Sequence, residues 1–354
     1  MGKLRKSLTG VVVPLLSILL AILIGAIIML CLGANPAVAL KNLVIGAFGS
    51  KPNIGTTLTK STPLIFTGLC ACFAYKCGVF NLGGEGQFIV GSIAACYVTL
   101  TTGITGFPAM LLAMIAGAVA GGIWGFIPGI LKITRGQNEM IISIMFNYIA
   151  TLLMGVIYTN WLRDGSVPQT AAVPKESMLP RIVTGMRMTW GFVIAIVLGI
   201  LIYYFLYRTS AGFRLRAVGL NPTASRFNGF PVKRFILISF IVSGAIAGLG
   251  GSVELLGTQY RLINGYASGY GFDGVAMALI GQLNPIATIV VALFFAALRA
   301  GATTMQAATG VPTSVSDIIQ ALVIVFTVAG MALTQLPEFT AFLQKHRREE
   351  AKKA

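Results

Sequence analysis

The sequence is poor in charge, in histidine and in paired cysteines. Only 10% of its 354 residues are charged, whereas 56% are apolar, and an ordinary soluble domain has about 25% charged residues. The single histidine, His346, lies in a charged C-terminal stretch, and no two of the five cysteines form a C-x-x-C pair. This scarcity excludes histidine-based catalysis in the apolar part of the chain and argues against a zinc site or a disulfide scaffold. The composition predicts a polytopic membrane protein.

The few charges are mostly basic, and the formal net charge is +16. An excess of this sign is typical of nucleic-acid binding, but here the basic residues gather in short segments between apolar runs, above all in residues 208–234. If the apolar runs cross a membrane alternately, these segments all lie on one side, as the positive-inside rule requires of cytoplasmic loops. The charge therefore predicts an orientation with both termini in the cytoplasm and does not indicate nucleic-acid binding.

Long apolar runs divide the chain into ten stretches of spanning or near-spanning length. They predict an all-α polytopic protein with helices near residues 11–33, 61–77, 86–102, 107–131, 139–160, 189–207, 235–256, 271–282, 285–303 and 313–334. The first run is too long for the apolar core of a signal peptide and is interpreted as an uncleaved helix.

Ten spans separate into two halves of five, residues 1–160 and 189–334, within one permease domain covering 1–354 and ending in a charged cytoplasmic tail, 335–354. Because five is odd, the halves have opposite orientations, which predicts the 5+5 inverted repeat that transporters build around a midplane site.

A glycine-rich stretch, "GVFNLGGEGQF" at residues 78–88, lies between the second and third apolar runs. A similar pattern, "GYGFDG" at 269–274, opens the eighth run, which is the third of the second half. Glycines and polar groups at the start of a span allow a broken helix that lines a cavity, although close helix packing is an alternative reason for the glycines. Intramembrane ionisable residues are functional candidates, so we predict a polar substrate pathway lined by Phe80, Asn81, Glu85, Gln87, Phe272 and Asp273.

The polar segment 208–234, called the coupling segment below, has the pattern of a structured element. Asn221 followed by Pro222 is typical of a helix start, and Gly229 is typical of a helix end. The pattern predicts a short helix from Pro222 to Asn228, preceded by a structured piece that ends at Gly219. A basic helix held outside the bilayer suits docking to a partner, whereas a solvated loop would explain the arginines but not the caps.

The run "GFRLRAVGLNPTASRFNGFPVKRF" resembles the cytoplasmic coupling loop of ABC importer permeases of the ribose, nucleoside and branched-chain amino-acid branch, which share a broader architecture with the cobalamin permease. The matching positions are Gly212, Arg216, Ala217, Gly219, Asn221, Ala224 and Gly229. The resemblance extends over nearly the whole chain and includes "FNLGGEGQF" and the run Ser243 to Gly251. Within the branch, the chain looks most like nucleoside permeases that work with a basic-membrane-protein-type lipoprotein.

This resemblance implies a bacterial plasma-membrane subunit that is not an enzyme and holds no cofactor, since ATP is bound by separate ATPase subunits. It also implies a second related permease as a heterodimer partner and an extracellular binding lipoprotein, for which the connection 163–187 supplies a docking surface or acts as a mere spacer. The residues implied in ATPase coupling are Arg214, Arg216, Gly219, Asn221, Pro222, Ala224, Arg226 and Gly229.

Three alternatives remain open at this point. A simple-sugar permease of the ribose type is one, although that branch usually has "IDLS" where this chain has "FNLG". A second is an ion-coupled secondary transporter that uses Glu85 or Asp273, which would not need the capped cytoplasmic helix. The third, a membrane-embedded enzyme, lacks histidine, paired metal ligands and a nucleophile with an evident base.

Overall fold

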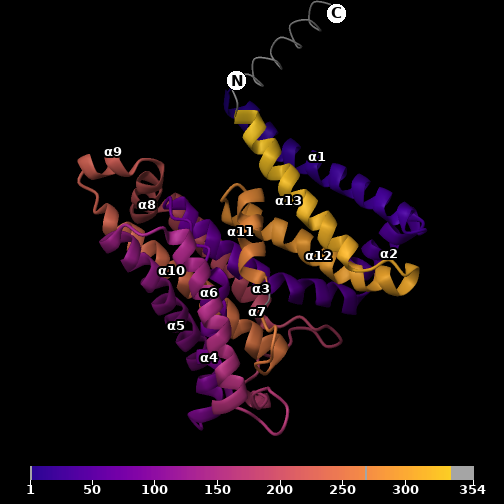
Figure 1. The fold of residues 1–354 in the computed structure, drawn as a ribbon, viewed down its shortest axis with the longest axis horizontal. Coiled ribbons are helices and arrows are strands. Elements are labelled where there is room, and N and C mark those ends of the chain that lie inside the picture. Colours follow the sequence, from indigo (N-terminus) through magenta and orange to yellow (C-terminus); the bar gives the residue numbers. More distant parts are fainter. Residues whose placement is uncertain (1, 268, 336–354) are drawn as a thin grey trace, which may run out of the picture. The chain divides into compact units, whose positions relative to one another are not determined.

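The computed structural model describes residues 2–267 and 269–335, and this part of the chain is dominated by helices (Figure 1). Apart from its first residue, the predicted tail 335–354 lies outside the described residues. The α-helices are α1 Gly2–Cys31, α2 Pro36–Phe48, α3 Lys51–Lys76, α4 Gly84–Thr101, α5 Gly106–Arg135, α6 Glu139–Val156, α7 Trp190–Arg208, α8 Ser210–Leu220, α9 Pro222–Phe227, α10 Val232–Glu254, α11 Tyr270–Ile280, α12 Pro285–Thr309 and α13 Ser314–Gln335. Three short helical pieces are η1 Ile157–Trp161, η2 Lys175–Ser177 and η3 Leu255–Gln259, of which η1 and η3 are π-helical.

Seven helical segments in the described part are long and apolar enough to cross a membrane, and each covers one of the ten predicted stretches. The other three stretches fall on α3, α4 and α11, which are helical but shorter or less apolar. The 11 residues of α11 extend about 16 Å, half the thickness of a bilayer core. The structure also contains α2, which the apolar runs did not predict. The all-helical class is confirmed, and the count of ten spans stays a prediction.

Helix α3 is buried over most of its length and is less apolar than the seven spanning helices. It begins at Lys51 rather than near residue 61, since Ser50 caps it by accepting a hydrogen bond from Asn53 N at 3.3 Å. Every residue from Ser61 to Tyr75 is buried. A helix buried on all sides needs no apolar face for lipid, so threonine and serine are tolerated where their hydroxyls bond to the backbone.

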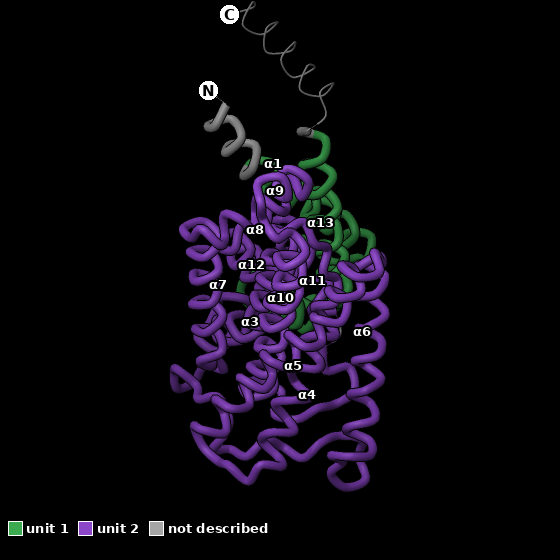
Figure 2. The backbone as a smooth tube through the Cα atoms, turned by 90° about the vertical axis from the view of Figure 1, so that its left-hand side faces the viewer, with its two compact units in different colours: residues 1–46, 298–354 green, residues 47–297 purple. Residues whose placement is uncertain are grey.

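The described chain forms two compact units, which Figure 2 colours separately. Unit 1 combines the residues up to Gly46 with those from Leu298 onward, and unit 2 is Ala47–Ala297. The chain passes between them within α2 and α12. This division does not follow the predicted halves 1–160 and 189–334, and the repeat relation between those halves stays a prediction.

Unit 1 is built on the pairing of α1 with α13. A Cβ added to Gly25 would lie 2.6 Å from the Ile319 side chain, so the two helices approach closely there. A polar contact supports the unit, because Arg299 Nε donates to Gln320 Oε1 at 3.2 Å.

The core of unit 2 is a crossing of α5 and α10 at their glycines. A Cβ added to Gly121 would collide with the carbonyl oxygen of Gly244, and one added to Gly248 would collide with that of Gly117. These glycines are four residues apart in each helix and therefore share a face, which is the small-xxx-small pattern of close membrane helix pairs. Helix α4 joins the crossing through Gly91, whose added Cβ would meet Gly248.

The two ends of unit 2 differ in character (Figure 1). Helices α8 and α9 lie at one end, and residues 162–189, called the connection below, lie at the other. Helix α7 joins these ends with 19 residues, a length of about 28 Å. The predicted docking segment and the predicted receptor-facing connection are therefore at opposite ends of the unit.

Candidate functional site

The glycine-rich stretch 78–88, called the α4 opening below, brings two helix ends together. Glu85, in the first turn of α4, is 8% exposed, and its carboxylate accepts hydrogen bonds from Gly269 N at 2.7 Å and from Gly271 N at 2.5 Å. Both glycines lie at the N-terminus of α11. A Cβ added to Gly271 would collide with the backbone of Glu85, so the N-termini of α4 and α11 are in direct contact.

This contact explains why a carboxylate is placed inside an apolar protein. The N-terminus of a helix carries a partial positive charge and unpaired N–H groups. Two such ends meet at Glu85, whose negative charge offsets both, while its two oxygens satisfy two N–H groups of α11. The two stretches that the sequence pattern paired, around residues 81 and 273, are thus joined by a hydrogen-bonded carboxylate.

Asn81 and Gln87 form a second buried polar cluster in the α4 opening. Each is 1% exposed. Asn81 Nδ2 donates to Gln87 Oε1 at 3.0 Å and to Ser243 Oγ of α10 at 2.8 Å, and Gln87 Nε2 donates to Asn81 Oδ1 at 3.1 Å. The same Oδ1 also accepts from Gly83 N at 2.9 Å. The amide groups are therefore engaged with one another and with the chain.

Asn147 of α6 holds the opening from a third direction. Its Oδ1 accepts from Gly86 N at 2.8 Å, and its Nδ2 donates to the carbonyl of Leu82 at 2.9 Å. The asparagine is 6% exposed and was not among the residues predicted from the sequence, although an amide within an apolar run was a signal available there. The irregular backbone before α4 is held by side chains from α6 and α10.

The predicted pathway residues do not all gather at one place. Glu85, Asn81 and Gln87 belong to the buried α4 opening, whereas Phe80 is 45% exposed and packs on Tyr75 with ring centroids 4.9 Å apart. Phe272 is 49% exposed, and Asp273 is partly buried in the first turn of α11. Their role in a substrate pathway stays a prediction.

The coupling segment begins with α8, which packs on the end of α3. A Cβ on Gly219 would collide with the carbonyl oxygen of Lys76. The prediction that Gly219 ends the first structured piece is wrong by one residue, because α8 continues to Leu220 and the glycine allows this close approach. Arg216 anchors the same helix: its Nε donates to the carbonyl of Leu206 at 2.8 Å, and its guanidinium lies 4.9 Å from the Tyr207 ring centroid.

Helix α9 has the caps that the sequence predicts. Asn221 Oδ1 accepts from Ala224 N at 2.9 Å, and Pro222 occupies the first helical position. The helix ends at Phe227, and Gly229 has a φ of 77°, the left-handed conformation of a helix C-terminus. Arg214 approaches the turn that follows, with its guanidinium 5.9 Å from the Phe230 ring.

The surface formed by the end of α8 and by α9 carries two large, exposed apolar side chains. Leu220 is 88% exposed and Phe227 is 89% exposed, and Ala224 and Arg226 are exposed as well. Large apolar side chains that protrude from a small rigid helix are typical of a protein-binding site. The coupling residues Ala224 and Arg226 therefore lie on an accessible surface, as docking requires.

At the opposite end of unit 2, the connection packs against η3 and the residues that follow it, and its role as a docking surface or a spacer stays a prediction. Thr170, Val173 and Leu179 are at most 3% exposed. Their backbone N–H groups donate, in the same order, to the carbonyl oxygens of Leu262, Tyr260 and Leu256, and the last of these bonds is 2.9 Å long.

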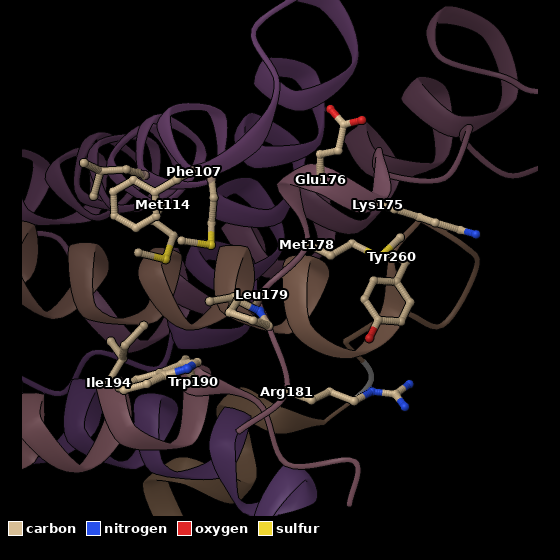
Figure 3. A pocket seen from close by; sticks show the side chains of 13 residues that line it. Phe107, Met114, Lys175, Glu176, Met178, Leu179, Arg181, Trp190, Ile194 and Tyr260 are labelled. Carbon is tan, nitrogen blue, oxygen red and sulfur yellow. The ribbon is translucent and has the colours of Figure 1, made fainter. Parts of the chain in front are cut away.

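The packed connection forms one wall of an open cavity of about 750 Å³. Figure 3 shows the apolar side chains of α5 and α7 on one side and the charged side chains of Lys175, Glu176 and Arg181 on the other. The volume is that of a site for a small molecule. Besides the charged groups, the lining side chains include Phe107, Met114, Leu179, Trp190, Ile194 and Tyr260.

The sequence interpretation also missed Glu254, the last residue of α10. It is 3% exposed, and its Oε2 has no hydrogen-bond partner among the described residues. A carboxylate within the apolar run 235–256 is a signal that the sequence offers for this residue. No group of three or more acidic, cysteine or histidine residues in the described ranges is placed to bind a metal ion.

Apolar helices of spanning length, an opening before α4 held by buried polar groups and a short capped helix between α8 and α10 are typical of an integral membrane transport protein. The chain belongs to the family of permease components described as "Branched-chain amino acid transport system / permease component", whose model matches residues 53–328. It is the permease subunit of an ABC importer. The membership accounts for the likeness of the coupling segment to the loops of ABC permeases.

Three relatives are similar over most of their length. The chain is 37% identical to the guanosine ABC transporter permease protein NupP of Bacillus subtilis, over 93% of this chain and 96% of the relative. It is 36% identical to the nucleoside ABC transporter permease protein NupB of Lactococcus lactis, over 92% and 91% of the two chains. It is 30% identical to the glucose ABC transporter permease protein TsgB13 of Haloferax volcanii, over 90% and 87%. Each of these organisms also has a second relative, 26% or 27% identical, named as a permease for the same substrate.

Proposed function

We propose that this permease carries nucleosides from an extracellular binding lipoprotein into the cytoplasm. The observation that carries the proposal is the similarity, over more than nine tenths of the chain, to permeases named for guanosine and for nucleosides. A nucleoside combines a flat base with a hydroxyl-rich sugar, and aromatic, amide and carboxylate groups are its natural complements. The cavity bordered by the connection has such groups in the rings of Phe107 and Trp190 and the carboxylate of Glu176.

A second candidate substrate is a simple sugar, because the chain is also 30% identical to a permease named for glucose. Uptake of radiolabelled guanosine in cells that express the whole transporter, with excess ribose or glucose as competitor, separates the two. We expect adenosine to compete and the sugars to have no effect. Strong competition by a sugar, or no guanosine uptake, would contradict the nucleoside assignment.

Energy for transport comes, in this proposal, from separate ATPase subunits that bind ATP and dock on the coupling segment. The support is structural: α9 is capped at both ends, and the side chains of Leu220, at the end of α8, and Phe227, at the end of α9, are exposed. Transport then requires no cofactor in this chain. The contact residues would come from Arg214, Arg216, Gly219, Asn221, Pro222, Ala224, Arg226 and Gly229.

The translocation path is proposed to form with a second, related permease as a heterodimer. The relatives support this arrangement, since three organisms each have two permeases named for one substrate, one closer to this chain than the other. Co-expression with tagged candidates tests it. Recovery of a complex with two copies of this chain and no second permease would overturn the heterodimer.

The proposed topology has ten spans in a 5+5 inverted repeat of the cobalamin-permease type, with both termini in the cytoplasm of a bacterial cell. Helices α4 and α11, which meet at Glu85, would be the third helices of the two halves, and the shortness of α11 is typical of the broken helices of such repeats. Labelling of single cysteines with an impermeant reagent tests the orientation. Position 176 should react in intact cells, and labelling of position 221 there would contradict the model.

A further inference from the structure

Two cations of unit 2 meet at one tyrosine ring, where α3 and α7 end and α8 begins. Helix α3 ends at Lys76, α7 ends at Arg208, and α8 packs against both. Lys76 Nζ lies 5.9 Å from the ring centroid of Tyr207, and the Arg216 guanidinium lies 4.9 Å from the same centroid. All three side chains are partly buried. Lys76, Tyr207 and Arg216 are called the basic cluster below.

Within the described chain, the basic cluster has two cations and no counter-ion. Lys76 Nζ makes neither a hydrogen bond nor an ion pair there, and the Arg216 guanidinium uses only Nε, which donates to the carbonyl of Leu206 at 2.8 Å. Lys132, by contrast, is paired with Glu139. Two like charges held at one ring repel each other. The unused donors of an ammonium and a guanidinium match an anion with several acceptor oxygens.

An apolar and aromatic face of α7 leads to the basic cluster. Ile200, Tyr203, Tyr204 and Tyr207 lie on this face, because residues spaced by three, four and seven positions are neighbours on a helix surface. Ile200 and Tyr204 are more than half exposed, and the Tyr203 ring packs on Tyr207 with centroids 5.0 Å apart. Since α7 is one of the helices of spanning length, this face suits contact with lipid acyl chains.

The basic cluster lies where a spanning helix reaches the lipid headgroups. Tyr207 is in the last turn of α7, and Arg216 reaches back to Leu206 in that turn. Tyrosine rings and the charged ends of lysine and arginine are typical of this layer of the bilayer, and basic pockets between helices on the cytoplasmic side bind anionic headgroups. Lys76 belongs to α3 and not to the coupling segment, so a lipid explains the pair of cations better than the ATPase does.

We propose that the basic cluster binds the phosphate of an anionic phospholipid. The phosphate oxygens accept hydrogen bonds from the Lys76 ammonium and the Arg216 guanidinium, and the acyl chains lie along the exposed face of α7. In the proposed topology this lipid belongs to the cytoplasmic leaflet. The lipid would join the end of α3 to α8, the first helix of the coupling segment, by neutralising a cation on each. This inference is independent of which substrate the transporter carries.

The test measures the lipid that stays bound to the complete transporter. The complex of permease and ATPase is placed in nanodiscs of phosphatidylcholine with increasing shares of phosphatidylglycerol, and native mass spectrometry counts the phosphatidylglycerol retained. We expect the affinity for this lipid to be about tenfold lower in Lys76→Gln, because a charged hydrogen-bond donor is lost. Lys76→Arg keeps the charge and should bind like the unaltered protein. Lys51→Gln, which removes the same charge at the other end of α3, should leave the affinity unchanged.

Several outcomes would overturn the inference. Unchanged retention in Lys76→Gln is one, and an equal loss in Lys51→Gln, which would indicate a nonspecific effect of charge, is another. Displacement of the lipid by soluble glycerol phosphate would show that the cluster binds a free phosphate instead. Loss of the ATPase from Lys76→Gln in phosphatidylcholine alone would show that the cations serve the ATPase. Because no readout depends on guanosine uptake, a failure of the nucleoside assignment would leave this inference standing.

Discussion

The α4 opening and the coupling segment are both glycine-punctuated polar stretches, yet their polar and apolar groups find partners in different places. In the α4 opening, Asn81, Glu85 and Gln87 bond to groups of the same chain. In the coupling segment, the caps close α9 on itself, while Leu220 and Phe227 protrude without cover. The first stretch stabilises the fold, whereas the second leaves large apolar side chains exposed, as the proposed docking of a partner requires. Substitutions should therefore affect stability in one region and coupling in the other.

The largest effect should come from Glu85→Ala in the α4 opening. It removes the acceptor for two backbone N–H groups at the start of α11, each of which costs about 1–3 kcal/mol when left unpaired. We expect a large drop in the thermal midpoint of the purified complex and poor recovery from the membrane. Glu85→Gln keeps one acceptor oxygen, so its thermal midpoint should lie between those of Glu85→Ala and the unaltered protein. An unchanged midpoint in Glu85→Ala would contradict the comparison.

Asn81→Leu should come next, because it breaks the bonds to Gln87, Ser243 and the backbone of Gly83 together. We expect a loss of about 2–4 kcal/mol in the free energy of unfolding, seen as a lower thermal midpoint, with uptake reduced in proportion to folded protein. Ser243→Ala, which removes one bond, should lose about 1 kcal/mol. If uptake disappears while the midpoint is unchanged, Asn81 acts on the substrate and not through the fold.

In the coupling segment, Phe227→Ala should leave the thermal midpoint unchanged, because the ring is 89% exposed. Loss of an apolar anchor from a docking surface typically removes about 1–3 kcal/mol of binding, so the ATPase should bind the permease about 5- to 150-fold more weakly and uptake should fall. Ala224→Glu should act in the same direction through charge and bulk. The measurements are ATPase co-purification and nucleoside uptake, and full activity in both variants would rule out this face of α9.

The smallest effect is expected for Arg226→Ala. An exposed ion pair contributes at most about 1 kcal/mol, so ATPase affinity should fall by about fivefold or less. The difference from the unaltered protein should shrink further at high salt, which screens exposed charges. A loss as large as that of Phe227→Ala would show that the arginine is buried and paired in the assembled transporter.

Local patterns in the sequence predicted local structure well. The caps of α9 at Asn221 and Gly229 depend only on neighbouring residues, and they were predicted from those residues. Apolar runs likewise predicted the seven spanning helices. Apolar runs did not predict α2, because it is short, or the true start of α3, because residues 51–60 are mostly polar.

Contacts between distant parts of the chain could not be predicted from a single sequence. Nothing near Glu85 indicates that its partners are the N–H groups of Gly269 and Gly271, and nothing near Asn147 indicates that it bonds to Gly86. The similarity of the two glycine-rich stretches gave part of this information, since it identified the two helix N-termini that are in contact. The hydrogen-bond partners of these residues depend on the packing of α4, α6, α10 and α11, which local sequence patterns do not predict.

The glycine crossing of α5 and α10 has a mechanical consequence. Where backbones touch at Gly117, Gly121, Gly244 and Gly248, no flexible side chains lie between the helices to absorb a change of angle. Close-packed backbone deforms little, so α4, α5 and α10 should move as one stiff lever. A displacement of α9, which lies next to the start of α10, would then be transmitted along α10 to Glu254 at its other end.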